Sequence, residues 1–344
     1  RSGFVATGSK TDEFENQFGE MIGNPNVIAT NSCSSAIALA LSLAEIQPDD
    51  EVVCSALTCL AVNESVLQTG ANIVWADIDP DTGNISPESI QSRITEKTKA
   101  IVYSHWVGRL AEIEAINKIA DEYQLKTIED AASALGGEYD GKPIGSHSDY
   151  VTFSFQAVKH ITTGDGGMLA VKTFSERERA ILLRNHGNDR KAKRSPLTLG
   201  FDVHEAGWKY QMNDISATLG IGQLKIFNRL KETYNKNSQI YELRLKNIPG
   251  LKILKEYPKA SSNLWVFTIL VENQEDFVKK MQEHQIGCSI IHPRNDHFSI
   301  FDPFQNNNLP NLDYFYNHMM NLPVGWWLSE ETTHKICDII TNGW

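Results

Sequence analysis

Residues 153–167 have the sequence FSFQAVKHITTGDGG, and this stretch joins two apolar runs. Tyr150 to Phe155 predicts a buried strand on one side, and Met168 to Val171 predicts another on the other side. Between them lies a polar, glycine-rich segment that contains Lys159. A lysine between a strand end and a glycine-rich turn is partly buried, which lowers its pKa and favours Schiff-base chemistry. A lone lysine is more often a solvated surface group, so neighbouring segments must decide.

Strands and helices alternate along the first two-thirds of the chain. Short apolar runs predict strands at residues 51–54, 72–76, 99–104 and 126–129. Helical spacing marks residues 34–43 and 112–123, and Asn31 or Ser32 can cap the first of these helices. Such alternation favours an α/β layered domain with a mainly parallel sheet.

The remainder of the chain predicts a smaller α+β domain. A long helical pattern runs from about Gly207 to Leu243. Beyond it we expect, in order, a strand, a helix, a strand and a helix at residues 265–271, 274–284, 287–291 and 330–341. We therefore predict a large domain of residues 1–235 and a small domain of residues 236–344.

One long polar loop lies inside the predicted large domain. It runs from Asn188 to Ala206 and contains four basic residues, Arg190, Lys191, Lys193 and Arg194. We expect a loop of this length to be mobile or to cover a site.

The composition is that of an ordinary globular protein. Hydrophobic residues make up 41% and charged residues 22% of the 344 residues. The net charge of −11 argues against a nucleic-acid surface, which needs a basic stripe. Five cysteines match no zinc spacing, and no metal is expected. We find no membrane span and no signal peptide, so we expect a cytoplasmic enzyme whose sequence lacks a short N-terminal piece.

Two segments at predicted strand ends can bind an anionic, flat ligand. Residues 31–36 precede a helix, and their hydroxyls and backbone N–H groups suit a phosphate, although an ordinary helix cap has the same pattern. Residues 127–132 carry Asp130 at a strand end, where it can pair with a cationic ring nitrogen, and Ala132 leaves room for a flat ring. A helix-capping aspartate is the other interpretation.

A third segment lies in the predicted small domain. Residues 292–297 read His-Pro-Arg-Asn-Asp-His. Arginine and histidine beside a strand are suitable partners for a phosphate or carboxylate, and a plain polar loop is the alternative.

Taken together, these segments give the chain a resemblance to one protein family over nearly its whole length. The most specific piece is Ser154-Phe155-x-x-x-Lys159-x-Ile161-Thr162-x-Gly164-x-Gly166-Gly167. It is accompanied by Glu129-Asp130-Ala131-Ala132, by Arg184-Asn185-His186-Gly187, and by Gly207-Trp208-Lys209-Tyr210-Gln211-Met212 with Asp214 and Gln223-Leu224. The chain resembles the nucleotide-sugar aminotransferases of the DegT/DnrJ/StrS type, which depend on pyridoxal 5'-phosphate (PLP).

The resemblance implies a fold and a set of residue roles. The fold is α/β, the aspartate-aminotransferase fold (fold type I of the PLP-dependent transferases). It has a mainly parallel, seven-stranded-type sheet flanked by helices, with a smaller α+β C-terminal domain. By position, Lys159 forms the Schiff base and Asp130 pairs with the ring nitrogen, and these two are the catalytic residues. The implied cofactor-binding residues are Ser34, Ser35, Cys59, Asp130, Ala132, Ser133, Ser154, Lys159 and Lys209. The implied substrate-binding residues are His292, Arg294 and His297.

Several of these positions depart from the family pattern. Cys33-Ser34 stands where Gly-Thr is common, and Cys59 stands where an aromatic residue often stacks on the cofactor. Ser133 replaces the usual glutamine, and Asp165 replaces a glutamate. Lys209 takes the place of an asparagine that reaches the neighbouring subunit's cofactor, so the resemblance implies a homodimer with shared active sites.

The implied reaction moves an amino group from L-glutamate to a keto sugar on a nucleotide. Family members that act at C-4 often read Lys-x-Ile-Thr, as Lys159 to Thr162 does. We therefore expect amination at C-4 of a 4-keto-6-deoxy sugar. The rivals are a PLP-dependent sugar dehydratase, in which histidine replaces the lysine, and a non-catalytic regulator or scaffold.

Overall fold

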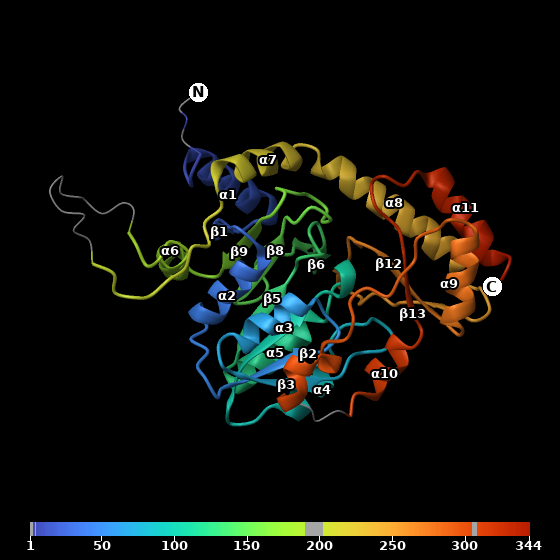
Figure 1. Ribbon diagram of the computed structural model, residues 1–344, viewed down its shortest axis with the longest axis horizontal. Coiled ribbons are helices and arrows are strands. Elements are labelled where there is room, and N and C mark those ends of the chain that lie inside the picture. Colours follow the sequence, from blue (N-terminus) through green and yellow to red (C-terminus); the bar gives the residue numbers. More distant parts are fainter. Residues whose placement is uncertain (1–2, 4, 190–201, 305–307) are drawn as a thin grey trace.

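A seven-stranded sheet forms the centre of the protein (Figure 1). The computed structural model describes residue 3 and residues 5–189, 202–304 and 308–344. In spatial order, the strands are β1 (Val27–Thr30), β9 (Gly167–Val171), β8 (Tyr150–Ser154), β5 (Lys126–Asp130), β4 (Thr98–Ser104), β2 (Glu51–Ser55) and β3 (Asn72–Ala76).

All neighbouring strands are parallel except where β9 is involved. This strand runs antiparallel to both β1 and β8. The seven strands therefore make the mainly parallel α/β sheet that the sequence predicts.

Helices cover both faces of this sheet because its strands are apolar on both sides. Val52 and Cys54 of β2 face one core cluster, and Val53 faces the other. The first cluster includes α2 (Cys33–Leu43), α3 (Leu60–Leu67) and α6 (Phe174–Leu183). The second includes α1 (Ser9–Ile22), α4 (Pro87–Arg93), α5 (Ile113–Tyr123) and α7 (Asp214–Leu224).

The C-terminal part has its own antiparallel sheet and core. The sheet has the order β10 (Leu251–Ile253), β12 (Phe267–Val271) and β13 (Met319–Leu322). Its core cluster is shared with the helices α8 (Phe227–Leu245), α9 (Gln274–Glu283) and α11 (Glu330–Thr341). A smaller α+β unit is therefore present, as the sequence predicts.

Short elements link the two parts. They are β6 (Glu138–Tyr139), β7 (Lys142–Pro143), β11 (Ala260–Ser261), the 3-10 helices η1 (Trp106–Gly108), η2 (Asn295–His297) and η3 (Ser299–Phe304), and α10 (Pro310–Tyr316). β11 of the C-terminal part pairs with β6, and Phe301 of η3 packs against Trp75 of the large sheet. The backbone N–H groups of Asn311 and Leu312 in α10 donate to the carboxylate of Asp77, which follows β3.

The predicted boundary between residues 235 and 236 falls inside α8. Figure 1 shows this helix running from the side of the large sheet to α9 and α11. Because η3 and α10 return to the core of the large sheet, the two cores are not separated by one cut in the sequence. The division at residue 235 remains a prediction.

Two element predictions are wrong. The helical pattern from Gly207 forms two helices, because residues 207–213 are not helical and α7 begins only after the Asn213 side chain caps Ser216. Residues 287–291 do not form a strand, because only Ser289 pairs with β13. In the predicted loop from Asn188 to Ala206, all four basic residues lie outside the described residues.

Candidate active site

Polar residues end three parallel strands at one edge of the large sheet. β4, β5 and β8 end at Ser104, Asp130 and Ser154. The first turn of α2 reaches the same edge, because β1 and β8 both pair with β9. A Cβ atom on Gly167 would lie only 2.5 Å from the carbonyl of Ser32, so glycine is needed where β9 passes α2.

Lys159 lies in the loop between β8 and β9 and lines a cavity of about 350 Å³ at this edge. Its Nζ donates a hydrogen bond to Ser133 Oγ at 2.9 Å and lies 4.0 Å from the ring centroid of Trp265. Burial lowers the pKa of Lys159, and the opposing effect of Asp130 is smaller. A larger share of this amine is therefore neutral and nucleophilic than of a solvated lysine.

Asp130 lines the same cavity and is only 6% exposed. Its Oδ1 accepts a hydrogen bond from the Ala132 backbone N–H at 3.0 Å, and its Oδ2 accepts one from Ser104 Oγ at 2.9 Å. The Cys33 thiol lies 4.0 Å from Oδ1. Within the described residues, no lysine, arginine or histidine forms an ion pair with this carboxylate. It can therefore hold a protonated nitrogen of a bound ligand.

The start of α2 forms the polar end of the cavity. The Ser32 side chain caps the helix by accepting the Ser35 N–H at 3.1 Å. Ser34 and Ser154 line the cavity. Ser35 does not line it, because its hydroxyl donates to Asn31 at 2.6 Å. Hydroxyls beside a helix N-terminus suit a phosphate, so Ser34 and Ser154 fit their predicted role better than the side chain of Ser35 does.

The other predicted cofactor residues lie at different distances from the cavity. Cys59 and Ala132 line it, and Ser133 reaches it through its bond to Lys159. Lys209 is exposed and does not line it, although its carbonyl accepts a hydrogen bond from Asn31 at the start of α2.

The structure brings one of the three predicted substrate residues to the cavity. His292 lines it and stacks on Trp265, with 6.3 Å between ring centroids. Burial, assisted by the charge of Lys159, lowers the pKa of His292 to about 4. Arg294 is buried and bound by Asp296 and Asp313, and His297 is exposed outside the cavity. The roles of Arg294 and His297 therefore remain predictions.

Sequence reasoning missed Trp265, which covers the lysine. Its Nε1 donates to the Val158 carbonyl at 2.7 Å, so the ring is fixed beside Lys159. A tryptophan next to a strand is usually a core residue, and no local pattern distinguishes this one. The remaining lining residues were given no individual role: Ser32 and Cys33 lie in the predicted anion-binding segment, Gln156, Val158, Asp165 and Gly166 lie in the segment around Lys159, and Ile37, Ala61 and Val62 lie outside both.

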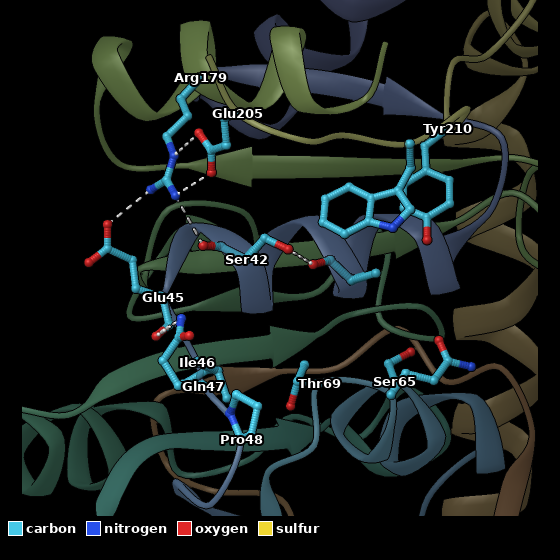
Figure 2. Close-up of a pocket in the computed structure, with 13 residues that line it drawn as sticks. Ser42, Glu45, Ile46, Gln47, Pro48, Ser65, Thr69, Arg179, Glu205 and Tyr210 are labelled. Carbon is cyan, nitrogen blue, oxygen red and sulfur yellow. Dashed lines mark hydrogen bonds and ion pairs between the residues drawn. The ribbon is translucent and has the colours of Figure 1, made fainter. Parts of the chain in front are cut away.

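A second cavity lies at the other end of α2, and Figure 2 shows its lining. Its most prominent charged group, Arg179, is held by Glu205 at 2.8 Å and by Glu45 at 3.3 Å. Trp208 and Tyr210 stack beside it. It offers no lysine and no buried carboxylate, so it does not match the predicted chemistry.

Across the described part of the chain, no three histidine, cysteine or acidic residues are grouped as metal ligands. Within the same residues, none of the helices combines the length and apolar character that crossing a membrane requires.

Comparison with known proteins shows the family of this chain and, with it, the ligand that the cavity binds. A model of the DegT/DnrJ/EryC1/StrS aminotransferase family matches residues 1–341. The chain belongs to this family. It is therefore an enzyme, and the aminotransferases of its family depend on PLP.

Solved structures and a curated relative support this membership. The crystal structure of AtS13 from Actinomadura melliaura has a TM-score of 0.96 and 34% identity, covering 100% of this chain and 93% of that one. The sugar aminotransferase CalS13 from Micromonospora echinospora has a TM-score of 0.96 and 29% identity, covering 100% and 94%. The spore coat polysaccharide biosynthesis protein SpsC of Bacillus subtilis is 29% identical, over 99% of this chain and 91% of its own.

The residues of this DegT-family enzyme fit PLP. An amine for its carbonyl carbon, a carboxylate for its ring nitrogen and hydroxyls at a helix N-terminus for its phosphate all line one cavity. Among the described residues, the carboxylate Asp130 has no cationic partner, which leaves it free for a pyridinium nitrogen. The fold is that of the PLP-dependent sugar aminotransferases, as the resemblance implied.

Proposed function

We propose that this enzyme transfers an amino group from L-glutamate to C-4 of a 4-keto-6-deoxy sugar carried on a nucleotide. The observation that carries the proposal is the lysine amine of Lys159 in one cavity with the Asp130 carboxylate. The sugar is supported by the similarity to the sugar aminotransferase CalS13. The choice of C-4 rests on the Lys-x-Ile-Thr pattern from Lys159 to Thr162.

In this proposal, Lys159 both holds the cofactor and moves the proton. PLP, when bound, supplies the electron sink for the charge that develops at the substrate carbon. The Lys159 amine would hold PLP through its carbonyl carbon. When an amino donor is bound, Lys159 Nζ would take the proton from the donor's α-carbon and would also be the group that returns it. The lowered pKa of Lys159 favours this base role at neutral pH.

Asp130 and the residues around Lys159 supply charge and shelter. The Asp130 carboxylate keeps a proton on the ring nitrogen, because the ionic hydrogen bond favours the charged form. Trp265 covers the Lys159 amine and limits its contact with water. His292 is neutral at pH 7, since its pKa is about 4, and its ring can donate or accept a hydrogen bond with a sugar hydroxyl.

The dehydratase alternative loses support from the position of His160. An alignment shifted by one residue would put this histidine in place of the lysine. The His160 ring is buried, does not line the cavity, and packs against Tyr234 of α8 with 4.7 Å between centroids. Lys159 is the side chain that lines the cavity.

The reaction is tested with a panel of nucleotide keto sugars. We expect 2-oxoglutarate and a nucleotide amino sugar from glutamate with at least one 4-keto-6-deoxy sugar on UDP, GDP or dTDP, detected by mass spectrometry. NMR of the product shows which carbon carries the nitrogen. Conversion of the cofactor by glutamate without any sugar product would overturn the substrate class. Nitrogen at C-3 would overturn the C-4 assignment.

The role of Lys159 is tested separately. Borohydride treatment of the PLP-loaded protein should attach the cofactor to the peptide that contains Lys159. Lys159→Ala should lose this mass shift and all transamination. Lys172→Ala, which changes an exposed lysine paired with Asp149, should retain both. Attachment at another lysine would contradict the assignment and favour the non-catalytic reading.

The sequence predictions for oligomeric state and location also become proposals. We propose a homodimer in the cytoplasm, with Lys209 reaching the cofactor of the neighbouring subunit. The exposed position of Lys209 beside the start of α2 supports this role. Sedimentation of the PLP-loaded protein tests the homodimer. The PLP affinity of Lys209→Ala, compared with that of the wild type, tests the role of Lys209.

A further inference from the structure

The catalytic carboxylate lies at the end of a chain of two hydroxyl groups. Ser104 Oγ lies 2.9 Å from Asp130 Oδ2, and Thr58 Oγ1 lies 2.6 Å from Ser104 Oγ. An ionised carboxylate can only accept, so Ser104 donates to Asp130. The Ser104 oxygen then accepts the Thr58 proton. Both hydroxyl protons therefore point toward Asp130.

The large sheet fixes these three residues. Ser104 ends β4 and lies opposite Asp130 in the parallel register with β5. Thr58 follows the end of β2, the next strand of the sheet, and is only 4% exposed. The side-chain amide of Asn295 donates to the Thr58 carbonyl at 3.0 Å, and Asn295 itself is fully buried. Thr58, the outer residue of the hydrogen-bonded series, is therefore held in place by the C-terminal part of the protein.

These contacts do more than satisfy buried hydroxyls. Hydrogen bonds to a carboxylate favour its ionised form, and bonds in series strengthen one another in a low-dielectric site. They also orient the carboxylate: Ser104 occupies Oδ2, and the Ala132 N–H occupies Oδ1. A carboxylate held in this way keeps its direction toward the cavity.

We propose that Thr58 and Ser104 are positioning residues that hold the Asp130 carboxylate directed at the ring nitrogen of PLP. Neither residue lines the cavity, so both act only through Asp130. The proposal rests on the proposed function only in requiring PLP as the ligand of Asp130. It is independent of the sugar and of the amino donor.

Pairs of variants with the same shape provide the test. Ser104→Thr keeps a hydroxyl, whereas Ser104→Val has the shape of threonine without the hydroxyl. Thr58→Val removes the outer hydroxyl in the same manner. Thr127→Val is the matched control, because the Thr127 hydroxyl donates to another carboxylate, Asp149, at the opposite end of β5.

The readouts are the dissociation constant of PLP from the cofactor-free protein and the nitrogen-15 shift of labelled PLP when bound. Removing a hydrogen bond to a charged group should weaken PLP binding about tenfold in Ser104→Val. The nitrogen-15 shift should move from the pyridinium toward the neutral pyridine value. Thr58→Val should move both readouts in the same direction by a smaller amount. Ser104→Thr and Thr127→Val should match the wild type.

Each outcome decides the question. Wild-type values in both Ser104→Val and Thr58→Val would overturn the proposal. So would equal changes in Thr127→Val, because these would indicate a general loss of sheet stability. If Ser104→Val does not fold, Thr58→Val decides alone. If the panel of nucleotide keto sugars yields no product, the proposed substrate is wrong. The PLP dissociation constant and the nitrogen-15 shift still test the roles of Thr58 and Ser104 in that case.

Discussion

Lys159 lies close to a buried histidine and a half-buried histidine whose pKa values are depressed. Burial is the main cause for both, and the charge of Lys159 contributes; the pKa falls to about 3 in His160 and about 4 in His292. Both rings are therefore neutral at pH 7. Neither ring nitrogen of His160 has a hydrogen bond of normal geometry among the described residues. A neutral His160 next to Lys159 adds no positive charge that would compete with the amine.

This arrangement predicts sensitivity to acid. Below pH 6.5 the unfolded chain binds protons at His160 that the folded chain does not, so the free energy of unfolding decreases as the pH falls toward 4. From pH 7 to pH 4.5, the free energy of unfolding of His160→Phe should fall by about 2 to 3 kcal/mol less than that of the wild type. The difference arises because the pKa of His160 is about 3 in the folded protein and near 6.5 in the unfolded chain. Urea unfolding at both pH values measures this.

A surface histidine provides the control for that experiment. His284→Phe changes an exposed residue at the end of α9 and should follow the wild-type pH dependence. An unchanged pH dependence in His160→Phe would show that His160 titrates normally in the folded protein.

At the residue scale, the sequence predicted the groups that carry chemical motifs. Lys159, Asp130, Ser34 and Ser154 were found because each lies in a short pattern at a strand or helix end. Trp265 was missed because only the three-dimensional fold brings it to the cavity, whereas Cys33 lies beside Ser34 in a segment that the sequence pattern had already indicated. Arg294 illustrates the opposite case: its sequence suggests a free cation, but Asp313 comes from 19 positions further along the chain to bind it.

At the scale of elements, α2 joins stability to cofactor binding. Its first turn depends on the Ser32 cap, and Ser34 in the same turn lines the cavity. Ser32→Ala should lower the free energy of unfolding by about 1 kcal/mol. It should also weaken PLP binding severalfold, because the first-turn N–H groups lose their fixed direction.

An equivalent cap in a distant helix is the matched control. Ser329 caps α11 by accepting the Thr332 N–H, as Ser32 does for Ser35. Ser329→Ala should cost about the same stability and leave the PLP dissociation constant unchanged. Equal PLP affinity in Ser32→Ala and the wild type would contradict the link between the cap and the cofactor.

Element boundaries were predictable where one local signal dominates. Apolar runs fixed β3 and α11 to the residue, because both are bounded by polar or capping residues. The pattern at residues 287–291 has strand-like composition, but a strand also needs a free neighbouring edge along its whole length. β13 offers a partner only at Ser289. Pairing of this kind is invisible in one segment of sequence.

In the molecule taken as a whole, Gly108 is one point at which the two parts approach each other closely. Its φ is +104°, and a Cβ atom there would lie 2.6 Å from the carbonyl oxygens of both Ser133 and Asn263. Its neighbour Val107 accepts the Trp265 N–H at 2.9 Å. Two residues that contact the Lys159 amine, Ser133 and Trp265, are thus positioned around one glycine.

Gly108→Ala should therefore affect both folding and the lysine. We expect a loss of about 2 to 4 kcal/mol in the free energy of unfolding, from backbone strain and the clash. The displaced Trp265 should leave Lys159 more exposed to water, so the pH at which transamination reaches half its maximum should rise. Urea unfolding and the pH profile measure the two effects.

Gly222→Ala is the control for the glycine substitution. It lies in α7 with nothing within 4 Å of a new Cβ atom, so it should stabilise the protein by about 0.5 to 1 kcal/mol. Its pH profile should be that of the wild type. If Gly108→Ala has the pH profile of the wild type, the packing around this glycine does not affect the pKa of Lys159, and the prediction is wrong.

The close approach at Gly108 also has a consequence for the order of events during synthesis. The cavity takes its base from the N-terminal half and its cover, Trp265 and His292, from the last third of the chain. A nascent chain that has emerged only as far as β9 has its lysine and its carboxylate but exposes the amine to water. Since domains generally fold in the order in which they emerge, the growing chain acquires a sheltered amine only when translation is nearly complete.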